Sequence, residues 1–367
     1  MIRLTRVSAI ASIVLLSALS ANADIVIAVA GPMTGDLASY GEQMQIGAET
    51  AARIINAAGG VLGQPIAIQA EDDACDPKQA VQVANRIVSR GIDLVHGHFC
   101  SGSTLPASDV YDESGSAIVT LSTNPAITDR GMERVFRITG RDDAQGGVAA
   151  SDMIRRFGGK RFAVMDDKSI YGQGIAEEVV RALQAANQTI VFRGTINASE
   201  SDYSAIVSRL KAAGAEIVYF GGYHAEAGMI LRQAAQQGLP ITLYGGDGIA
   251  SSELAQIAGS AADGTYFTFS PDVRANPGAA AAVTAIRAAG FEPEGFTLYS
   301  YASIEVLAEG VRRAGTTEGE AVAKALRSKP IATVIGLVSF DDKGDNEQPG
   351  FVLYQWRDNE YALASQP

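Results

Sequence analysis

The feature that most constrains the fold is a regular alternation of short apolar runs with longer amphipathic segments. Buried parallel strands read as such runs, and each needs a crossover helix to reach the next strand. The predicted strands are Asp24–Ala30, Ile66–Ala70, two within Ile92–Asn124, Val135–Thr139, Arg161–Met165, Thr189–Thr195, Glu216–Phe220, Ile241–Tyr244, Gly264–Phe269, Val334–Phe340 and Phe351–Trp356. The first helix is predicted at Glu42–Ala57. This pattern predicts an α/β fold in which helices cover both faces of parallel sheets.

The alternation starts again after Gly140, which predicts two units of similar size without a visible sequence repeat. A single core stops growing at roughly 250 to 300 residues, so two lobes are expected for this chain. We assign residues 24–140 and 272–350 to an N-terminal lobe and residues 141–271 and 351–367 to a C-terminal lobe. The chain would then cross three times between the lobes, which predicts a hinge with a ligand cleft beside it.

The N-terminus resembles a secretory signal peptide. Two arginines, Arg3 and Arg6, precede an apolar run from Val7 to Leu19, and Ala21-Asn-Ala23 follows. We expect cleavage after Ala23 and export of the mature protein. Removal of both arginines changes the formal net charge from −12 to −14, and this acidity argues against nucleic acid or anionic membranes as partners.

Hydroxyl residues follow the two strands within Ile92–Asn124. One segment is Cys100-Ser-Gly-Ser-Thr104 and the other is Ser122-Thr-Asn124. At one sheet edge, beside helix N-termini, these residues would attract an anion the size of a carboxylate. The alternative is that they only cap helices, as Ser, Thr and Asn commonly do.

The residues expected at the strand ends lack a catalytic motif, so we expect a protein without enzymatic activity and without a cofactor. His96 and His98, conceivably with His224, could bind a metal, but ordinary packing or cap hydrogen bonds are the preferred interpretation. Asp166 and Asp167 beside Lys168 could act as acid and base, although a solvated loop is more common for such a cluster.

The chain has only two cysteines, Cys75 and Cys100. In an exported protein an even number favours a disulfide, here worth roughly 3 to 4 kcal/mol in the chain-entropy model. Two separate buried thiols are the alternative, and no Cys-x-x-Cys spacing supports a metal site.

Several long motifs resemble the leucine/isoleucine/valine-binding proteins. They are Glu71-Asp-Asp-Ala-Cys-Asp-Pro-Lys-Gln-Ala-Val81, His96-Gly-His-Phe-Cys-Ser-Gly-Ser-Thr-Leu-Pro-Ala-Ser108, Gly221-Gly-Tyr-His-Ala-Glu226 and Phe340-Asp-Asp-Lys-Gly-Asp345. The resemblance covers Asp24 to Trp356 and includes the cysteine pair. It implies the type I periplasmic binding protein fold, with two Rossmann-like lobes, and a periplasmic role in an ABC transporter.

The resemblance also implies how the charged ends of an amino acid are bound. Its carboxylate is expected at Ser101 and Thr123, and its ammonium at Asp247, a carbonyl near Leu121 and Thr123. The best-known members have glutamate where this chain has Asp247, which is one methylene shorter. Leu121 and Ser122 replace smaller residues of the familiar pattern, a change that would narrow the pocket.

Four aromatic residues complete the implied site. Tyr171 and Tyr223 are expected to close over the ligand from the far lobe, and Tyr40 and Phe99 to surround its side chain. We therefore expect a monomeric binding protein that delivers an aliphatic, branched-chain amino acid or close analogue to a membrane permease. The alternative is a sensor of an amino acid or amide, for which an output segment would be expected after Pro367.

Overall fold

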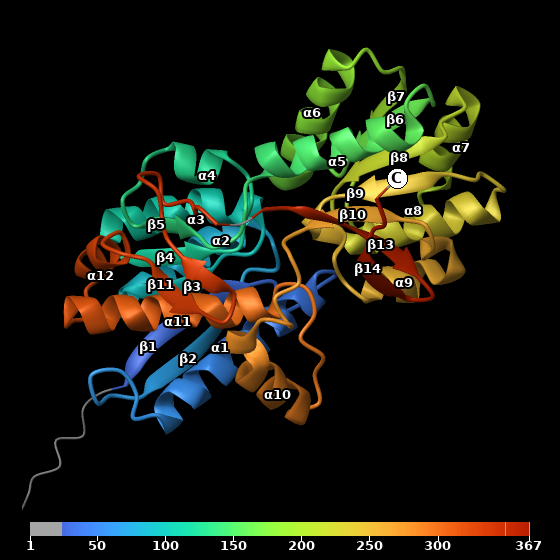
Figure 1. Ribbon diagram of the computed structural model, residues 1–367. Coiled ribbons are helices and arrows are strands. Elements are labelled where there is room, and N and C mark those ends of the chain that lie inside the picture. Colours follow the sequence, from blue (N-terminus) through green and yellow to red (C-terminus); the bar gives the residue numbers. More distant parts are fainter. Residues whose placement is uncertain (1–23, 349, 367) are drawn as a thin grey trace, which may run out of the picture.

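The computed structural model describes residues 24–348 and 350–366, which form two α/β lobes side by side (Figure 1). The predicted signal peptide, residues 1–23, lies outside the described residues. Within the part of the chain that is described, no helix is both long enough and apolar enough to cross a membrane.

The first sheet is entirely parallel and has the strand order β2-β1-β3-β4-β5. Its strands are β1 (Ile25–Gly31), β2 (Ile66–Asp72), β3 (Leu94–Gly97), β4 (Ala117–Thr120) and β5 (Val135–Arg137). Alternate side chains of β1 face opposite helix layers: Ile27 and Val29 join one apolar cluster, whereas Ala28 and Ala30 join another. Burial on both faces explains why the strands read as unbroken apolar runs.

The second sheet repeats this order as β7-β6-β8-β9-β10 and adds β13 and β14 beside β10. Its strands are β6 (Phe162–Asp166), β7 (Ile190–Thr195), β8 (Ile217–Gly221), β9 (Thr242–Gly245), β10 (Tyr266–Phe269), β13 (Val352–Arg357) and β14 (Glu360–Leu363). Its five strands from β7 to β10 are parallel, as predicted, and the two added strands are antiparallel, so the complete sheet is mixed. The shared order places a topological switch point in each lobe, between β1 and β3 and between β6 and β8, where α/β proteins bind ligands.

Helices cover both sheets. In the first lobe these are α1 (Ala38–Ala57), α2 (Pro77–Ser89), α3 (Ser101–Ser114), α4 (Ala126–Asp129), α10 (Ala280–Ala288), α11 (Thr297–Ala314) and α12 (Gly319–Leu326). In the second they are α5 (Asp142–Phe157), α6 (Ile170–Ala185), α7 (Ser204–Ala213), α8 (His224–Gln236) and α9 (Glu253–Ala258), with short 3₁₀ turns η1 (Asp247–Ile249) and η2 (Gly259–Ala262). A third 3₁₀ turn, η3 (Pro277–Ala279), directly precedes α10 in the first lobe. Helix α1 packs against α11, α2 against α3, and α5 against α6.

Two predicted elements differ from the structure. The strand predicted at Val334–Phe340 is instead part of an antiparallel pair, β11 (Ile331–Thr333) and β12 (Gly336–Val338). Gly336 has φ +108°, a conformation that glycine adopts readily and that turns the chain at this point. The first helix starts at Ala38 rather than Glu42, whereas Pro77 opens α2 as predicted.

The chain passes between the two sheets three times: from β5 to α5, after β10, and between β12 and β13. A buried ion pair holds two of these crossings together, because Arg137 Nε lies 2.7 Å from Asp345 Oδ1. Arg141, on the first crossing, also contacts Asp345 at 2.8 Å. Breaking one partner of a buried pair leaves the other charge uncompensated, so these residues fix the hinge.

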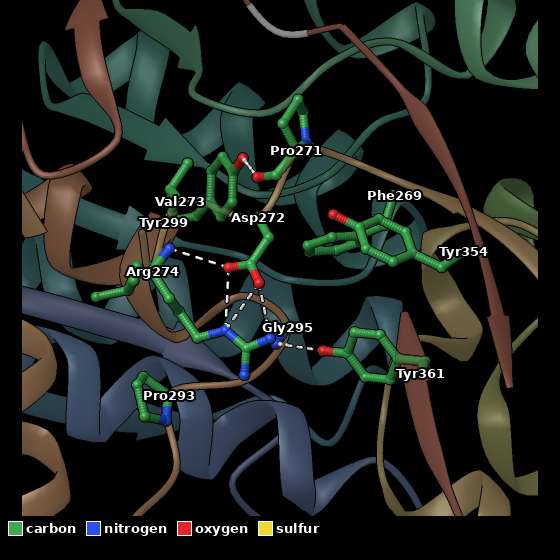
Figure 2. A pocket seen from close by; sticks show the side chains of 11 residues that line it. Phe269, Pro271, Asp272, Val273, Arg274, Pro293, Gly295, Tyr299, Tyr354 and Tyr361 are labelled. Carbon is green, nitrogen blue, oxygen red and sulfur yellow. Dashed lines mark hydrogen bonds and ion pairs between the residues drawn. The ribbon is translucent and has the colours of Figure 1, made fainter. Parts of the chain in front are cut away.

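The crossing after β10 is held by polar contacts of the residues in Figure 2. Arg274 pairs with Asp272 at 2.8 Å, and Tyr299 Oη donates to the Pro271 carbonyl at 3.3 Å. The cavity among these side chains has a volume of only about 20 Å³. That is room for about one water molecule, so a ligand the size of an amino acid must bind elsewhere.

Candidate functional site

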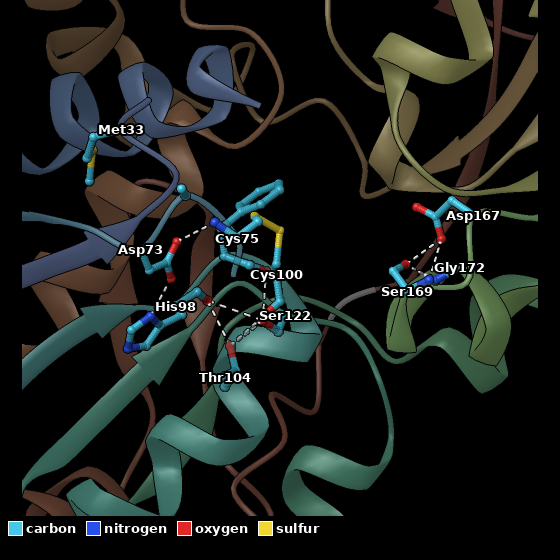
Figure 3. The surroundings of a disulfide bond; sticks show 12 residues. Met33, Asp73, Cys75, His98, Cys100, Thr104, Ser122, Asp167, Ser169 and Gly172 are labelled. Carbon is cyan, nitrogen blue, oxygen red and sulfur yellow. Dashed lines mark hydrogen bonds and ion pairs between the residues drawn. A yellow bond between two sulfur atoms is a disulfide. The ribbon is translucent and has the colours of Figure 1, made fainter. Parts of the chain in front are cut away.

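The carboxyl end of β3 is fixed by the predicted disulfide, which is present in the structure (Figure 3). Cys75 and Cys100 lie 25 residues apart in sequence, with their Cα atoms 5.5 Å apart. Below the bridge, His98 Nδ1 is 2.5 Å from Asp73 Oδ2, and His98 Nε2 is 3.1 Å from Tyr111 Oη. Cys100 precedes α3, so the bridge and this buried pair together position the first turn of that helix.

Hydroxyl groups join the loop after β3 to the loop after β4. Thr120 donates to the His98 carbonyl at 2.7 Å, and Ser122 donates to the Phe99 carbonyl at 2.7 Å. The Thr104 and Ser122 hydroxyls are 2.6 Å apart. The Ser122 side chain therefore holds the two loops together.

The two residues predicted to bind a carboxylate lie at the same edge of the first sheet. Ser101 is the first residue of α3, where backbone N–H groups lack partners within the helix and the helix dipole is positive. Thr123 is in the neighbouring loop, and the Asn124 N–H approaches Ser101 Oγ at 3.4 Å. Arg137 donates to the carbonyls of Ser122 and Asn124 at 3.0 and 2.9 Å. This edge can bind an anion through backbone and hydroxyl donors.

The acidic residue predicted to bind an ammonium group comes from the second lobe. Asp247 begins η1 directly after β9 and is 4% exposed. Tyr171 Oη donates to Asp247 Oδ1 at 2.8 Å and accepts the Gly248 N–H at 2.9 Å. Burial raises the pKa of Asp247 to about 6, because desolvation disfavours the ionised carboxylate. A cation bound beside Asp247 would stabilise the ionised carboxylate and so lower this pKa.

A second buried acid, Asp142, was not identified from the sequence. It is the first residue of α5, is 0% exposed, and neither carboxylate oxygen has a hydrogen-bond partner among the described residues. The pKa of Asp142 is raised well above its usual value. Burial is the main cause, and the negative charge of Asp247 is the second. The Gln145 Oε1 and Tyr219 Oη atoms are also buried without a partner in the described chain. An acid at a helix start usually indicates a cap, so nothing in the residue pattern distinguishes Asp142 from an ordinary capping residue.

Aromatic rings from both lobes form the walls of the site. Tyr40 stacks on Phe99 with ring centroids 4.5 Å apart, and Tyr171 lies 5.2 Å from Tyr223. The lobes meet here, because Tyr40 Oη donates to the Gly248 carbonyl at 2.8 Å.

The sequence analysis did not identify Phe296 as part of the site, and the carbonyl of the predicted residue Leu121 already accepts a hydrogen bond within the protein. Phe296 packs edge-on against Phe99 at 4.9 Å, although it precedes a helix and has no strand-end signal. Leu121 belongs to the core, and its carbonyl accepts the Thr139 hydroxyl at 3.0 Å. An ammonium group would have to share that carbonyl.

The remaining candidate groups form hydrogen bonds within their own lobes. His96 Nδ1 is 3.0 Å from the Val119 carbonyl, and His224 Nε2 is 2.8 Å from Glu253. Across residues 24–348 and 350–366, no three His, Cys, Asp or Glu side chains are grouped to hold a metal ion. Asp166 accepts the Lys168 N–H at 3.0 Å, and Asp167 accepts the Ser169 N–H at 2.9 Å.

Comparison with known proteins agrees with this geometry. The family model described as periplasmic binding protein matches residues 24–360. The chain is 47% identical over 339 residues to Leu/Ile/Val-binding protein homolog 1 of Brucella suis, covering 92% of this chain and 91% of the relative. It is also 47% identical over 342 residues to an amino acid binding protein of Pseudomonas aeruginosa, with the same coverage of 92% and 91%.

Solved structures show the same architecture. The leucine binding protein LivK of Thermotoga maritima superposes with a TM-score of 0.86 at 26% identity, covering 93% of this chain and 98% of that chain. LivJ of Streptococcus pneumoniae, a branched-chain amino acid transporter substrate binding protein in complex with isoleucine, has a TM-score of 0.84 at 27% identity, covering 92% and 98%. With a family match over nearly the whole described chain and relatives at this identity, the protein belongs to the periplasmic binding protein family.

Proposed function

We propose that the protein is the extracytoplasmic solute-binding component of an ABC transporter, and that it captures an aliphatic amino acid between its lobes. Export through the signal peptide, with cleavage after Ala23, would place it in the periplasm. There it would act as a monomer that delivers its ligand to membrane permease subunits. The relatives named for leucine, isoleucine and valine binding support this proposal.

The observation that carries the proposal is the arrangement of opposite charges across the cleft. Asp247 provides a buried negative charge on the second lobe, whereas the start of α3 at Ser101 provides N–H donors and a positive helix end on the first. A zwitterion satisfies both ends at once. Burial of either of its charges without a partner would cost several kcal/mol, so a molecule with only one charged group fits this site poorly.

The aromatic walls favour an aliphatic side chain. Tyr40, Phe99, Tyr171 and Tyr223 are each no more than 8% exposed, and Phe99 is within ring contact of Tyr40 and Phe296. Burial of each methylene against such surfaces contributes about 0.8 kcal/mol. At the other end of the ligand, the carboxyl groups of Asp247 and Asp142 would provide negative charge for its ammonium group.

We further propose that the cleft binds its ligand without transforming it. A hydroxyl nucleophile needs an adjacent base, usually histidine. The ring nitrogens of His96, His98 and His224 that form hydrogen bonds do so with Val119, Asp73, Tyr111 and Glu253, away from Ser101 and Thr123. Ser101 and Thr123 therefore act as hydrogen-bond donors.

Calorimetric titration of the mature protein with L-leucine and two analogues tests the proposal. N-acetyl-L-leucine lacks the positive charge, and L-leucinamide lacks the negative charge. We expect L-leucine or another aliphatic amino acid to bind and each analogue to bind about a hundredfold or more weakly, since each leaves one buried charged end unpaired. Failure of all aliphatic amino acids to bind, or equal affinity for N-acetyl-L-leucine, would overturn it.

A further inference from the structure

A second cavity lies between the lobes, beside the proposed amino-acid site. Its volume is about 340 Å³, and residues of both lobes line it. The disulfide between Cys75 and Cys100 is on one side and Asp167 is on the other, facing each other across the cleft in Figure 3. We call this cavity the cleft chamber.

The cleft chamber lies beside the proposed amino-acid site, because residues next to that site in sequence line it. Cys100 and Gly102 line the chamber and flank Ser101, and Ile170 lines it and precedes Tyr171. Tyr223 lines the chamber and also packs against Tyr171 in the wall of the amino-acid site. Neighbouring Cα atoms are about 3.8 Å apart, so the lining of the chamber begins one residue from Ser101 on each side, which is about the length of a short ligand side chain.

The polar lining of the cleft chamber is acidic. Asp36 comes from the first lobe, and Asp167 and Glu226 come from the second. The single cationic side chain of the lining, Lys168, directs its Nζ to Asn197 Oδ1 at 2.5 Å. The carboxylates therefore outnumber the positive charges around this space.

Asp167 provides an independent sign that a ligand group is needed. The residue is 4% exposed, and its Oδ1 accepts the Ser169 N–H and hydroxyl at 2.9 and 2.6 Å. Its Oδ2 is buried and has no hydrogen-bond partner among the described residues. Burial raises the pKa of Asp167 to about 6, with smaller contributions from Glu226 and Asp166. An ammonium group beside Oδ2 would stabilise the ionised form.

The chemistry of the lining narrows the class of ligand group. An anion would meet three carboxylates, and an apolar group would leave Asp167 Oδ2 unpaired at a cost of about 1 to 3 kcal/mol. A chelated metal ion does not fit either, because the described residues place no three acidic, His or Cys side chains together. Leu37, Pro77 and Ile170 add apolar surface. An ammonium group on a methylene chain matches both kinds of lining.

We propose that the cleft chamber binds the terminal ammonium group of a ligand side chain, with Asp167 and Glu226 as its acceptors. The ligands would then include amino acids with a short basic side chain as well as aliphatic ones. This inference rests on the proposed function, because the α-amino and α-carboxylate groups must be held in the neighbouring site.

A matched pair of ligands tests the inference. L-ornithine and L-norleucine have side chains of equal length, which end in an ammonium and a methyl group, respectively. In calorimetric titrations of the mature protein we expect L-ornithine to bind at least as tightly as L-norleucine. Asp167→Asn keeps an oxygen for the Ser169 cap, and we expect it to weaken L-ornithine about tenfold or more while changing L-norleucine by less than about twofold.

Glu226→Gln provides a second variant with the same expectation, in case the first disturbs the loop. Glu113→Gln, an equal change of charge on the exposed end of α3, is the control and should leave both affinities unchanged. Rejection of L-ornithine by the wild type while L-norleucine binds, or equal weakening of both ligands by Asp167→Asn, would overturn the inference and leave the proposed function intact. If L-norleucine and L-leucine also fail to bind, both this inference and the proposed function are overturned.

Discussion

Acidification should weaken amino-acid binding through one buried residue, Asp247. Burial raises the pKa of this carboxyl to about 6 when no cation lies beside it. The ligand's ammonium needs the ionised form, so binding below that pH must first remove a proton. Each pH unit below the pKa costs about 1.4 kcal/mol, or a factor of ten in affinity. Between pH 7.5 and pH 5 we therefore expect the dissociation constant to rise about tenfold.

The substitution Asp247→Asn separates this residue from other titrating groups. The amide keeps the size of the side chain but cannot ionise, so the variant should bind about ten- to a hundredfold more weakly at pH 7.5, the loss of one charge-assisted hydrogen bond. Its remaining affinity should no longer depend on pH over this range. Calorimetry at constant ionic strength, with circular dichroism as a check on folding, measures both effects. Wild-type affinity that stays constant from pH 5 to pH 7.5, or a variant that binds like the wild type, would refute the assignment.

The same carboxyl should destabilise the ligand-free protein at neutral pH. Its pKa is about 6 in the folded chain, whereas the ordinary pKa of an aspartate side chain is 3.8. The folded state therefore binds more protons between these values, and the stability contributed by this group is present below about pH 4 and lost as the pH rises through 6. Two pKa units correspond to about 3 kcal/mol. Asp247→Asn should accordingly raise the midpoint of thermal unfolding at pH 7.5 by several degrees.

Three other perturbations follow from the structure. Arg137→Met removes the 2.7 Å partner of Asp345, which keeps its contact with Arg141 at 2.8 Å, so urea unfolding should show a loss of about 1.5 to 3 kcal/mol, the size of one charged hydrogen bond. The bridge between Cys75 and Cys100 closes a 25-residue separation, so its reduction should lower the free energy of unfolding in urea by about 3.5 kcal/mol. Ligand binding at low temperature should persist after reduction. Asp142→Asn removes a negative charge beside Asp247, which should lower the pKa of Asp247. Calorimetry should then show that amino-acid binding weakens at a lower pH than in the wild type.

The fold could be predicted because its signals are local. Buried strands read as apolar runs, and the residues that follow parallel strands must lie at one sheet edge, which marks the segments that contain Ser101, Thr123 and Asp247 as candidates. The choice of these three residues within the segments rests on the resemblance to the leucine/isoleucine/valine-binding proteins. In the structure Ser101 and Thr123 lie in neighbouring loops of the first lobe, where the Asn124 N–H approaches Ser101 Oγ at 3.4 Å, and Tyr171 is bonded to Asp247 in the second lobe at 2.8 Å. Their roles toward a ligand remain proposals.

The features that were missed depend on packing between distant segments. Asp142 looks like an ordinary acid at a helix start, and only the hinge brings it beside Asp247. Strand β14 is a different case, because a local signal existed. Asp358 and Asn359 have φ values of +53° and +64° and form the two-residue connection between β13 and β14, a pattern typical of tight hairpins.

Under the proposed function, the two buried acids would link ligand capture to lobe closure. Closure is favoured by contacts such as Tyr40 Oη to the Gly248 carbonyl at 2.8 Å and Asn124 Nδ2 to the Ile170 carbonyl at 3.1 Å. The same closure removes Asp142 and Asp247 from water, which is costly unless a positive charge accompanies them. A ligand with an ammonium group offsets that cost only in the closed form, so its binding shifts the population toward closure. A molecule of similar shape without the positive charge has no such differential interaction, so the contacts between the lobes alone would have to offset the burial of both acids.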